Sequence, residues 1–130
     1  MNSTVKKLCC AIFIILILCG CSNVITEDQL IGGKWTPKSG YKDGKPSGDP
    51  QCPYLNKGME FKDEETVYVE DGGIDFKYSL NEARYGMHIY IYNPNGDLDG
   101  YEIIIENEDN LALIGSGTSE GFNCYFEREK

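Results

Sequence analysis

Apolar and polar side chains alternate with a period of two residues along most of the chain after Gly58. Successive side chains of a β-strand point to opposite faces, so this alternation predicts strands that each bury one face. Gly, Asn and Asp separate the alternating segments, as expected for turns between short strands. One further strand is predicted around Trp35, and the seven later segments are 59–62, 66–70, 74–80, 87–92, 101–106, 111–114 and 122–127.

Short antiparallel strands with one apolar face favour a sheet that closes on itself, because closure removes the exposed edges. We therefore predict an all-β fold for residues 30–130, a small antiparallel up-and-down barrel of about eight strands. The first and last strands of such a barrel are neighbours. About 110 residues follow the N-terminal segment, which is enough for one domain.

Gly, Pro, Ser and Lys predominate between Pro37 and Gly58, which predicts a long loop. Cys52 lies in this loop and Cys124 in the last predicted strand. They are the even pair that remains after residues 1–21, so a Cys52–Cys124 disulfide is predicted for an oxidising compartment. The expected closeness of the first and last strands agrees with this pairing. Two free thiols or a metal site are the alternatives, although neither cysteine has a second Cys or a His at metal-ligand spacing.

The N-terminal segment has a different pattern. Lys6 and Lys7 precede an uninterrupted apolar run from Leu8 to Leu18, which is the layout of a secretory signal. A transmembrane helix needs about 20 apolar residues, so this run is too short to span a bilayer. Residues 1–20 are therefore predicted to be a signal peptide.

The sequence Leu18-Cys19-Gly20-Cys21 resembles the lipobox of bacterial lipoproteins. The resemblance implies a lipid anchor with acyl chains such as palmitate on Cys21, and a short tether over residues 21–29. Ser22 is similar to the residue that directs such proteins to the outer membrane. The expected location is the bacterial cell envelope, on the outer membrane and facing the periplasm. A cleaved signal without a lipid is the alternative.

Without residues 1–20 the chain carries 10 Lys and Arg against 21 Asp and Glu, a net charge of −11. Binding to nucleic acid needs a basic patch, so this charge argues against a nucleic-acid partner. It also argues against a protein body that lies on an anionic lipid surface. The remaining interpretations are a basic partner and an acidic surface that only maintains solubility.

The sequence contains no arrangement of residues typical of catalysis. His88 is the only histidine, and a catalytic histidine needs an orienting acid and usually a nucleophile. Both cysteines of the domain are expected to be oxidised, and no Gly-x-Ser-x-Gly motif is present. We therefore predict a protein that is not an enzyme and that has no cofactor.

Three short stretches resemble the lipocalin-like (calycin-type) barrels: Gly33-Lys34-Trp35, Asp109 to Leu113 and Tyr125 to Arg128. The resemblance implies a barrel with Trp35 at its closed end, and Arg128 packed over the indole. It also implies that a small apolar or amphipathic ligand binds inside, with the loop 37–58 at the mouth. The ligand-binding side chains are then expected to be Trp35, Phe76, Met87, Ile89 and Ile103.

Ala83-Arg84-Tyr85 with the following strand Ile89–Tyr92 resembles the membrane-bound inhibitors of c-type lysozyme, although the inhibitory Ser of that family is missing. This resemblance implies the alternative function, an inhibitor or immunity-type protein that binds another protein. Tyrosines are favoured at protein interfaces. The outward-pointing side chains expected at such an interface are Tyr68, His88, Tyr90, Tyr92 and Tyr125; ordinary cross-strand pairing is the other interpretation.

One stretch has the spacing of a calcium loop, with oxygen-bearing side chains at Asn95, Asp97, Asp99 and Glu106. Its first position is Asn where Asp is nearly obligatory, and its second half has the alternation of a strand. We therefore predict a hairpin turn and no metal site.

Overall fold

The computed structural model describes residues 24–130, so the predicted signal peptide and the predicted lipidation site at Cys21 lie outside the described residues. The described chain contains ten strands and two 3-10 turns. The elements are η1 (Glu27–Gln29), β1 (Lys34–Ser39), β2 (Tyr41–Lys42), β3 (Lys45–Pro46), β4 (Met59–Phe61), β5 (Thr66–Val69), β6 (Ile74–Ala83), β7 (Gly86–Tyr92), β8 (Leu98–Asn107), β9 (Asn110–Ser116), η2 (Gly117–Ser119) and β10 (Asn123–Glu129).

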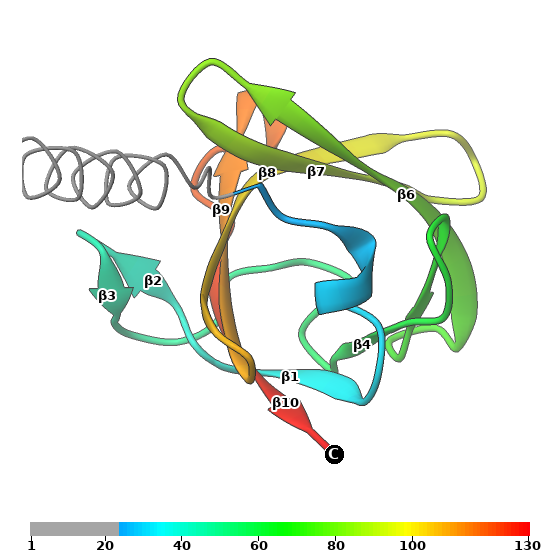
Figure 1. Ribbon diagram of the computed structural model, residues 1–130, viewed down its shortest axis with the longest axis horizontal. Coiled ribbons are helices and arrows are strands. Elements are labelled where there is room, and N and C mark those ends of the chain that lie inside the picture. Colours follow the sequence, from blue (N-terminus) through cyan, green and yellow to red (C-terminus); the bar gives the residue numbers. More distant parts are fainter. Residues whose placement is uncertain (1–23) are drawn as a thin grey trace, which may run out of the picture.

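Eight of the strands form a closed antiparallel barrel in the order β1-β10-β9-β8-β7-β6-β5-β4 (Figure 1). This confirms the predicted all-β barrel. Strand β7 illustrates how alternation in the sequence gives a strand with one buried face. Met87, Ile89 and Ile91 are buried, whereas His88 and Tyr90 are half-buried on the outside. Residues 24–130 contain no helix that is both long and apolar enough to cross a membrane.

The barrel closes where the two ends of the chain meet. Strand β1 pairs with β10 from Lys34↔Glu129 onward, and on its other side it pairs with β4 through Trp35↔Met59. A disulfide joins Cys52 to Cys124, with 6.0 Å between the Cα atoms. The structure therefore confirms that the first and last strands of the barrel are neighbours, and it confirms the predicted disulfide.

One end of the barrel, which we call the N-terminal end, is covered by the segment that contains η1 (Figure 1). Leu30 is fully buried there, and its carbonyl oxygen accepts a hydrogen bond of 2.9 Å from the indole nitrogen of Trp35. Ile25 also packs against the core. Part of the segment expected to be a polar tether is thus folded against the barrel.

The opposite end, which we call the loop end, is covered by the chain that follows Cys52. The side chain of Leu55 is 2 % exposed and lies beside Phe76, Ile91 and Tyr101. Backbone hydrogen bonds from Leu55 to Cys52 and from Gly58 to Leu55 hold this segment in a compact turn. Both ends of the barrel are therefore covered by apolar side chains.

The region from Pro37 to Gly58 is less irregular than predicted. It contains the small ribbon β2–β3, which lies outside the barrel against β10 and β9 (Figure 1). The ring of Tyr41 stacks on that of Tyr125, with 6.1 Å between centroids and 8° between planes. This contact leaves Tyr41 only 6 % exposed, so part of the outer wall is covered as well.

Candidate functional site

The barrel interior is filled where a ligand was expected. The five side chains predicted to line a ligand cavity all belong to the hydrophobic core, and none is more than 7 % exposed. The rings of Phe61 and Tyr78 meet edge to face across this core, with 4.8 Å between centroids. Between Leu55 and the core residues beneath it there is no room for a water molecule. These side chains occupy the interior themselves.

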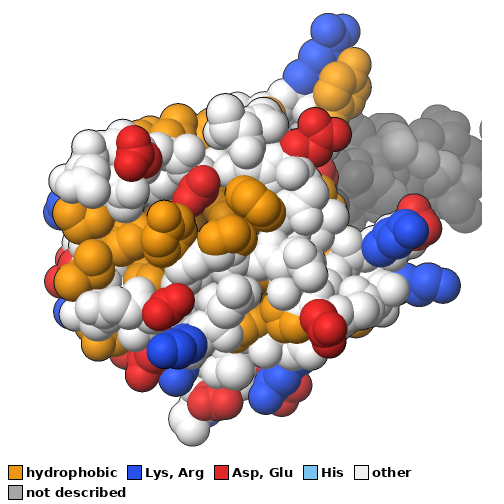
Figure 2. Space-filling view, turned by 180° about the vertical axis from the view of Figure 1, so that it is seen from behind, with side chains coloured by type: hydrophobic (Ala, Val, Ile, Leu, Met, Phe, Trp, Pro, Cys, Tyr) orange, Lys and Arg blue, Asp and Glu red, His pale blue; other side chains and the backbone are white. Residues whose placement is uncertain are grey.

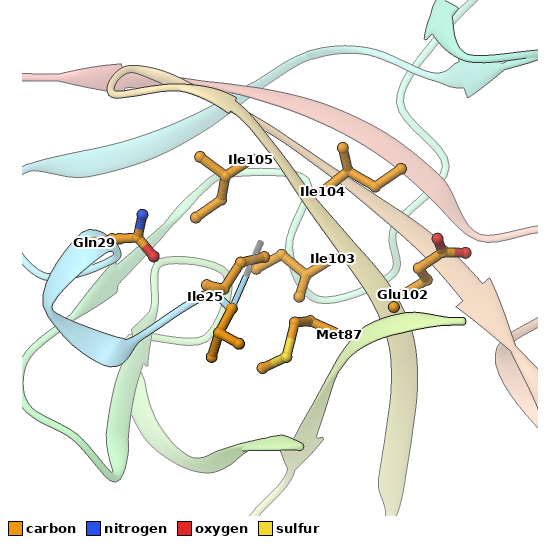
Figure 3. Close-up of a pocket in the computed structure, with 9 residues that line it drawn as sticks. Ile25, Gln29, Met87, Glu102, Ile103, Ile104 and Ile105 are labelled. Atoms are coloured by element: carbon orange, nitrogen blue, oxygen red, sulfur yellow. The ribbon is translucent and has the colours of Figure 1, made fainter. Parts of the chain in front are cut away.

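A groove of 440 Å³ lies at the N-terminal end, between the chain entering the barrel and the wall formed by β7 and β8 (Figure 3). Ile25, Met87 and Ile103 point toward one another in it, and Glu102 and Gln29 lie at its sides (Figure 3). Met87 and Ile103 belong to the predicted ligand-binding set, so two of those residues border a space that a small molecule could enter.

Trp35 and Arg128 form the contact that the lipocalin-like resemblance implies. The guanidinium carbon of Arg128 is 4.3 Å from the centre of the indole ring, a cation–π distance. Its nitrogens donate hydrogen bonds to the carbonyl oxygens of Gln29 (2.7 Å), Gly32 (2.9 Å) and Glu108 (2.6 Å). Trp35 is fully buried beneath this residue. Both side chains close the N-terminal end.

The structure does not gather the outward-pointing tyrosines on one face. Tyr90 lies beside His88 on β7, with 6.3 Å between ring centroids, whereas Tyr68 lies on β5 under the ammonium group of Lys62. Tyr125 is on β10, which the barrel order separates from β7 by β9 and β8. It is stacked under Tyr41, as described above.

The hydroxyl of Tyr125 donates a hydrogen bond of 2.7 Å to the carboxylate of Glu106. This bond, more than burial, raises the pKa of Tyr125 to about 12. A tyrosine whose ring is stacked and whose hydroxyl is bonded within the molecule offers little to a partner.

The four residues with calcium-loop spacing are not brought together. Asp97 is part of a turn in which the side chain of Asn93 caps two backbone N–H groups. Asp99 and Glu106 lie in β8, where they accept hydrogen bonds from Ser119 and Tyr125. Among residues 24–130, no group of three or more His, Cys, Asp and Glu side chains is placed to hold a metal ion.

The loop end carries a surface that the sequence did not reveal. Four large apolar side chains are strongly exposed there: Tyr54 (52 %), Ile74 (44 %), Tyr92 (36 %) and Leu98 (43 %). Ile74 begins β6, Tyr92 ends β7 and Leu98 begins β8, so the antiparallel order places all three at one end. Viewed from this side, the molecule shows apolar side chains gathered together with acidic side chains among them (Figure 2). We call these four residues the apolar patch.

A shallow recess lies within the loop end, beside the apolar patch. Asp99 is the carboxylate in its lining; the other residues are Pro53, Tyr54, Leu55, Phe76, Ile91 and Tyr101. Asp99 pairs with Ile91 across the β7–β8 ladder, on the inward-facing side of β8. Its Oδ1 accepts a hydrogen bond of 3.0 Å from the fully buried hydroxyl of Ser119, which fixes the carboxylate in place. Burial, with a smaller contribution from the Asp99 charge, raises the pKa of Tyr101.

Tyr54 forms the outer wall of the recess. Its ring is 6.4 Å from that of Phe76, and its backbone φ is 68°. This left-handed conformation is costly for a bulky residue and is often found where a side chain serves a function. A Pro-Tyr pair directly after a disulfide cysteine is the signal in the sequence from which this position could have been found.

Comparison of the chain with protein-family models, with curated proteins and with solved structures gives no significant match. The closed eight-stranded antiparallel barrel is compatible with the lipocalin-like architecture and with ligand binding.

Proposed function

We propose that this protein is a lipid-anchored, non-enzymatic protein of the bacterial envelope, and that it binds a protein partner through the apolar patch at the loop end. The patch is the observation that carries this proposal. Exposed apolar side chains gathered in one region of a small domain are typical of interaction surfaces, whereas scattered ones need no explanation. Tyrosine provides a large, rigid contact area with a polar tip.

The position of the patch supports the proposal. Ile25 lies in the groove with Met87, near the beginning of β7, whereas the patch lies where β7 ends. The chain therefore enters the barrel at the end opposite to the patch. A lipid on Cys21, four residues before Ile25, would hold the N-terminal end toward the membrane. The patch would then face away from the lipid and toward other proteins.

A photo-crosslinking residue in place of Tyr54 tests the proposal in the native envelope. The control is the same residue at Tyr85, which is 86 % exposed and lies at the N-terminal end, beside the first residue of β7. We expect a discrete protein adduct from position 54 and none from position 85. The adduct should disappear when Tyr92→Ser and Leu98→Ser are added. Equal adducts from both positions, or an adduct that survives these substitutions, would contradict a docking surface at the loop end.

The lipid anchor has its own test. Metabolic labelling with palmitate should mark the protein, and Cys21→Ala should remove the label and release the protein from the membrane fraction. A label that persists in the Cys21→Ala variant would show that the anchor lies elsewhere.

The groove at the N-terminal end favours a second candidate function, the binding of a small amphipathic ligand. Its volume of 440 Å³ lies within the range of small-molecule sites, and aliphatic side chains make up much of its lining. Native mass spectrometry of the protein purified from its own envelope should then show a bound small molecule. The ligand should be lost in Ile105→Arg and kept in the loop-end control Leu98→Arg.

A further inference from the structure

We propose that the recess at the loop end binds an arginine or lysine side chain, so that the protein partner is basic at the point of contact. The proposal rests on the function proposed above and specifies the chemistry of that partner. Its basis is one fixed carboxylate, Asp99, in a recess walled by the rings of Tyr54 and Phe76.

The lining of the recess suits a cation better than any other group. A carboxylate binds a guanidinium or ammonium group through charge-assisted hydrogen bonds. Aromatic faces attract the same cations through their quadrupoles. The aliphatic stem of Arg or Lys would lie against the apolar wall, as long basic side chains commonly do at interfaces. An anionic group would be repelled by Asp99, and a neutral apolar group would leave this carboxylate desolvated without a partner.

The state of Asp99 fits this role. In the described part of the chain its Oδ1 is bonded to Ser119, and no ion pair involves it. By comparison, Asp75 at the same end is paired with Lys62 at 2.9 Å, and Asp71 is paired with Lys57 at 3.7 Å. The carboxylate in the recess is thus oriented by the fold and left without an internal cation.

Tyr54 controls access to the recess. The space behind its ring is too small for a water molecule, so an incoming cation must displace the ring from Phe76 to reach Asp99. The ring is half exposed, so it can be displaced toward the solvent, while Cys52 and the buried Leu55 hold the segment on either side of it.

Charge decides between the candidate occupants. The described chain carries every acidic residue of the sequence and a net charge of −11, so a second copy would bring like charges together. An anionic membrane is disfavoured for the same reason, and the N-terminal end is the one closer to the proposed anchor. A basic protein is attracted by the same field, which also speeds its encounter.

The test uses n-butylguanidinium as the probe and neutral n-butylurea as its isostere, with the full chain in detergent micelles followed by NMR. We expect n-butylguanidinium to shift the amide signals of Tyr54, Asp99 and Ser119, and n-butylurea to leave them unchanged. Asp99→Asn keeps the acceptor for Ser119 but removes the charge, and it should weaken probe binding about tenfold. The matched control is Asp75→Asn, which removes a different carboxylate from the loop end. This variant should bind the probe as tightly as the unmodified protein does.

Three results would overturn the inference: no shift, equal shifts from both probes, or unchanged binding in Asp99→Asn. Shifts of the same signals on raising the protein concentration alone, or on adding phosphatidylglycerol vesicles, would replace the basic partner with a second copy or with a membrane. If the probe fails while the crosslink from position 54 succeeds, the docking surface stands and only the basic contact is wrong.

Discussion

The guanidinium of Arg128 lies over the indole ring of Trp35 at 4.3 Å and is bonded to carbonyl oxygens of both the N-terminal segment and the β8–β9 turn. Its side chain is only 9 % exposed. One residue of the last strand thereby connects the entry of the chain, the first strand and a distant turn. The stacked ring and the forked hydrogen bonds both require the planar guanidinium, which lysine lacks.

Arg128→Lys should therefore lower the free energy of unfolding by about 2–3 kcal/mol, because several hydrogen bonds and the cation–π contact are lost together. Urea unfolding followed by Trp35 fluorescence measures this loss. The control is Arg84→Lys. The guanidinium of Arg84 lies 5.5 Å from the exposed ring of Tyr85, so this variant should change the free energy of unfolding little. Equal effects at the two positions would mean that Arg128 does not hold the N-terminal end together.

Reduction of the Cys52–Cys124 disulfide should destabilise the barrel by about 4 kcal/mol, because it frees a loop closed over 72 residues in the unfolded chain. Urea unfolding with and without dithiothreitol measures the difference. A Cys52→Ser, Cys124→Ser double variant should match the reduced protein and should not respond to dithiothreitol. An unchanged midpoint on reduction of the parent would argue against the bond.

Leu30→Ala should destabilise the protein by about 2–5 kcal/mol, because truncation of a fully buried leucine leaves a cavity beneath the N-terminal segment. The matched surface change is Val24→Ala, since Val24 is 43 % exposed, and it should cost less than about 0.5 kcal/mol. Chemical denaturation of both variants gives the comparison. Similar small losses would show that η1 and Leu30 are not part of the folded core.

Tyr125 should ionise late in an ultraviolet titration, because Glu106 raises its pKa to about 12. A pKa raised on folding stabilises the protein fully below the unfolded pKa of about 10, and this contribution is lost as the pH rises through the folded value. Glu106→Gln should therefore bring one tyrosine back toward ordinary ionisation and should lessen the stability difference between neutral and alkaline pH. Tyr125→Phe, which removes that hydroxyl, should take one tyrosine out of the late ionisation and leave the late ionisation of Tyr101, whose pKa is raised by burial. An unchanged titration in Glu106→Gln would contradict the assignment.

The strands were predictable because their signal is local. In β7 and β10 each apolar side chain that alternates in the sequence is also buried in the barrel. The closure of the barrel followed from the need to remove sheet edges, which is a property of the whole set of strands. The disulfide followed from the one pair of cysteines left after the predicted signal peptide and lipidation site. These predictions required only the period of two residues and the positions of Cys52 and Cys124.

The ribbon and the candidate site were not predictable in the same way. Strands β2 and β3 contain two residues each, too few to show a period, and the contact between Tyr41 and Tyr125 joins distant parts of the chain. Tyr54 and Asp99 are likewise brought together only by barrel closure. The filled interior depends on contacts between side chains of different strands, such as Phe61 on β4 and Tyr78 on β6, and no local pattern reports such packing.

The bonds from Arg128 to Gln29 and Gly32 also determine how the molecule responds to force. A pull on the chain before Ile25 reaches the last strand through one guanidinium before it can peel β1 away from β10. Strand β1 begins where β10 ends, at Lys34↔Glu129, so the contacts of Arg128 reinforce the end of the ladder at which a pull on the N-terminus would begin to open it.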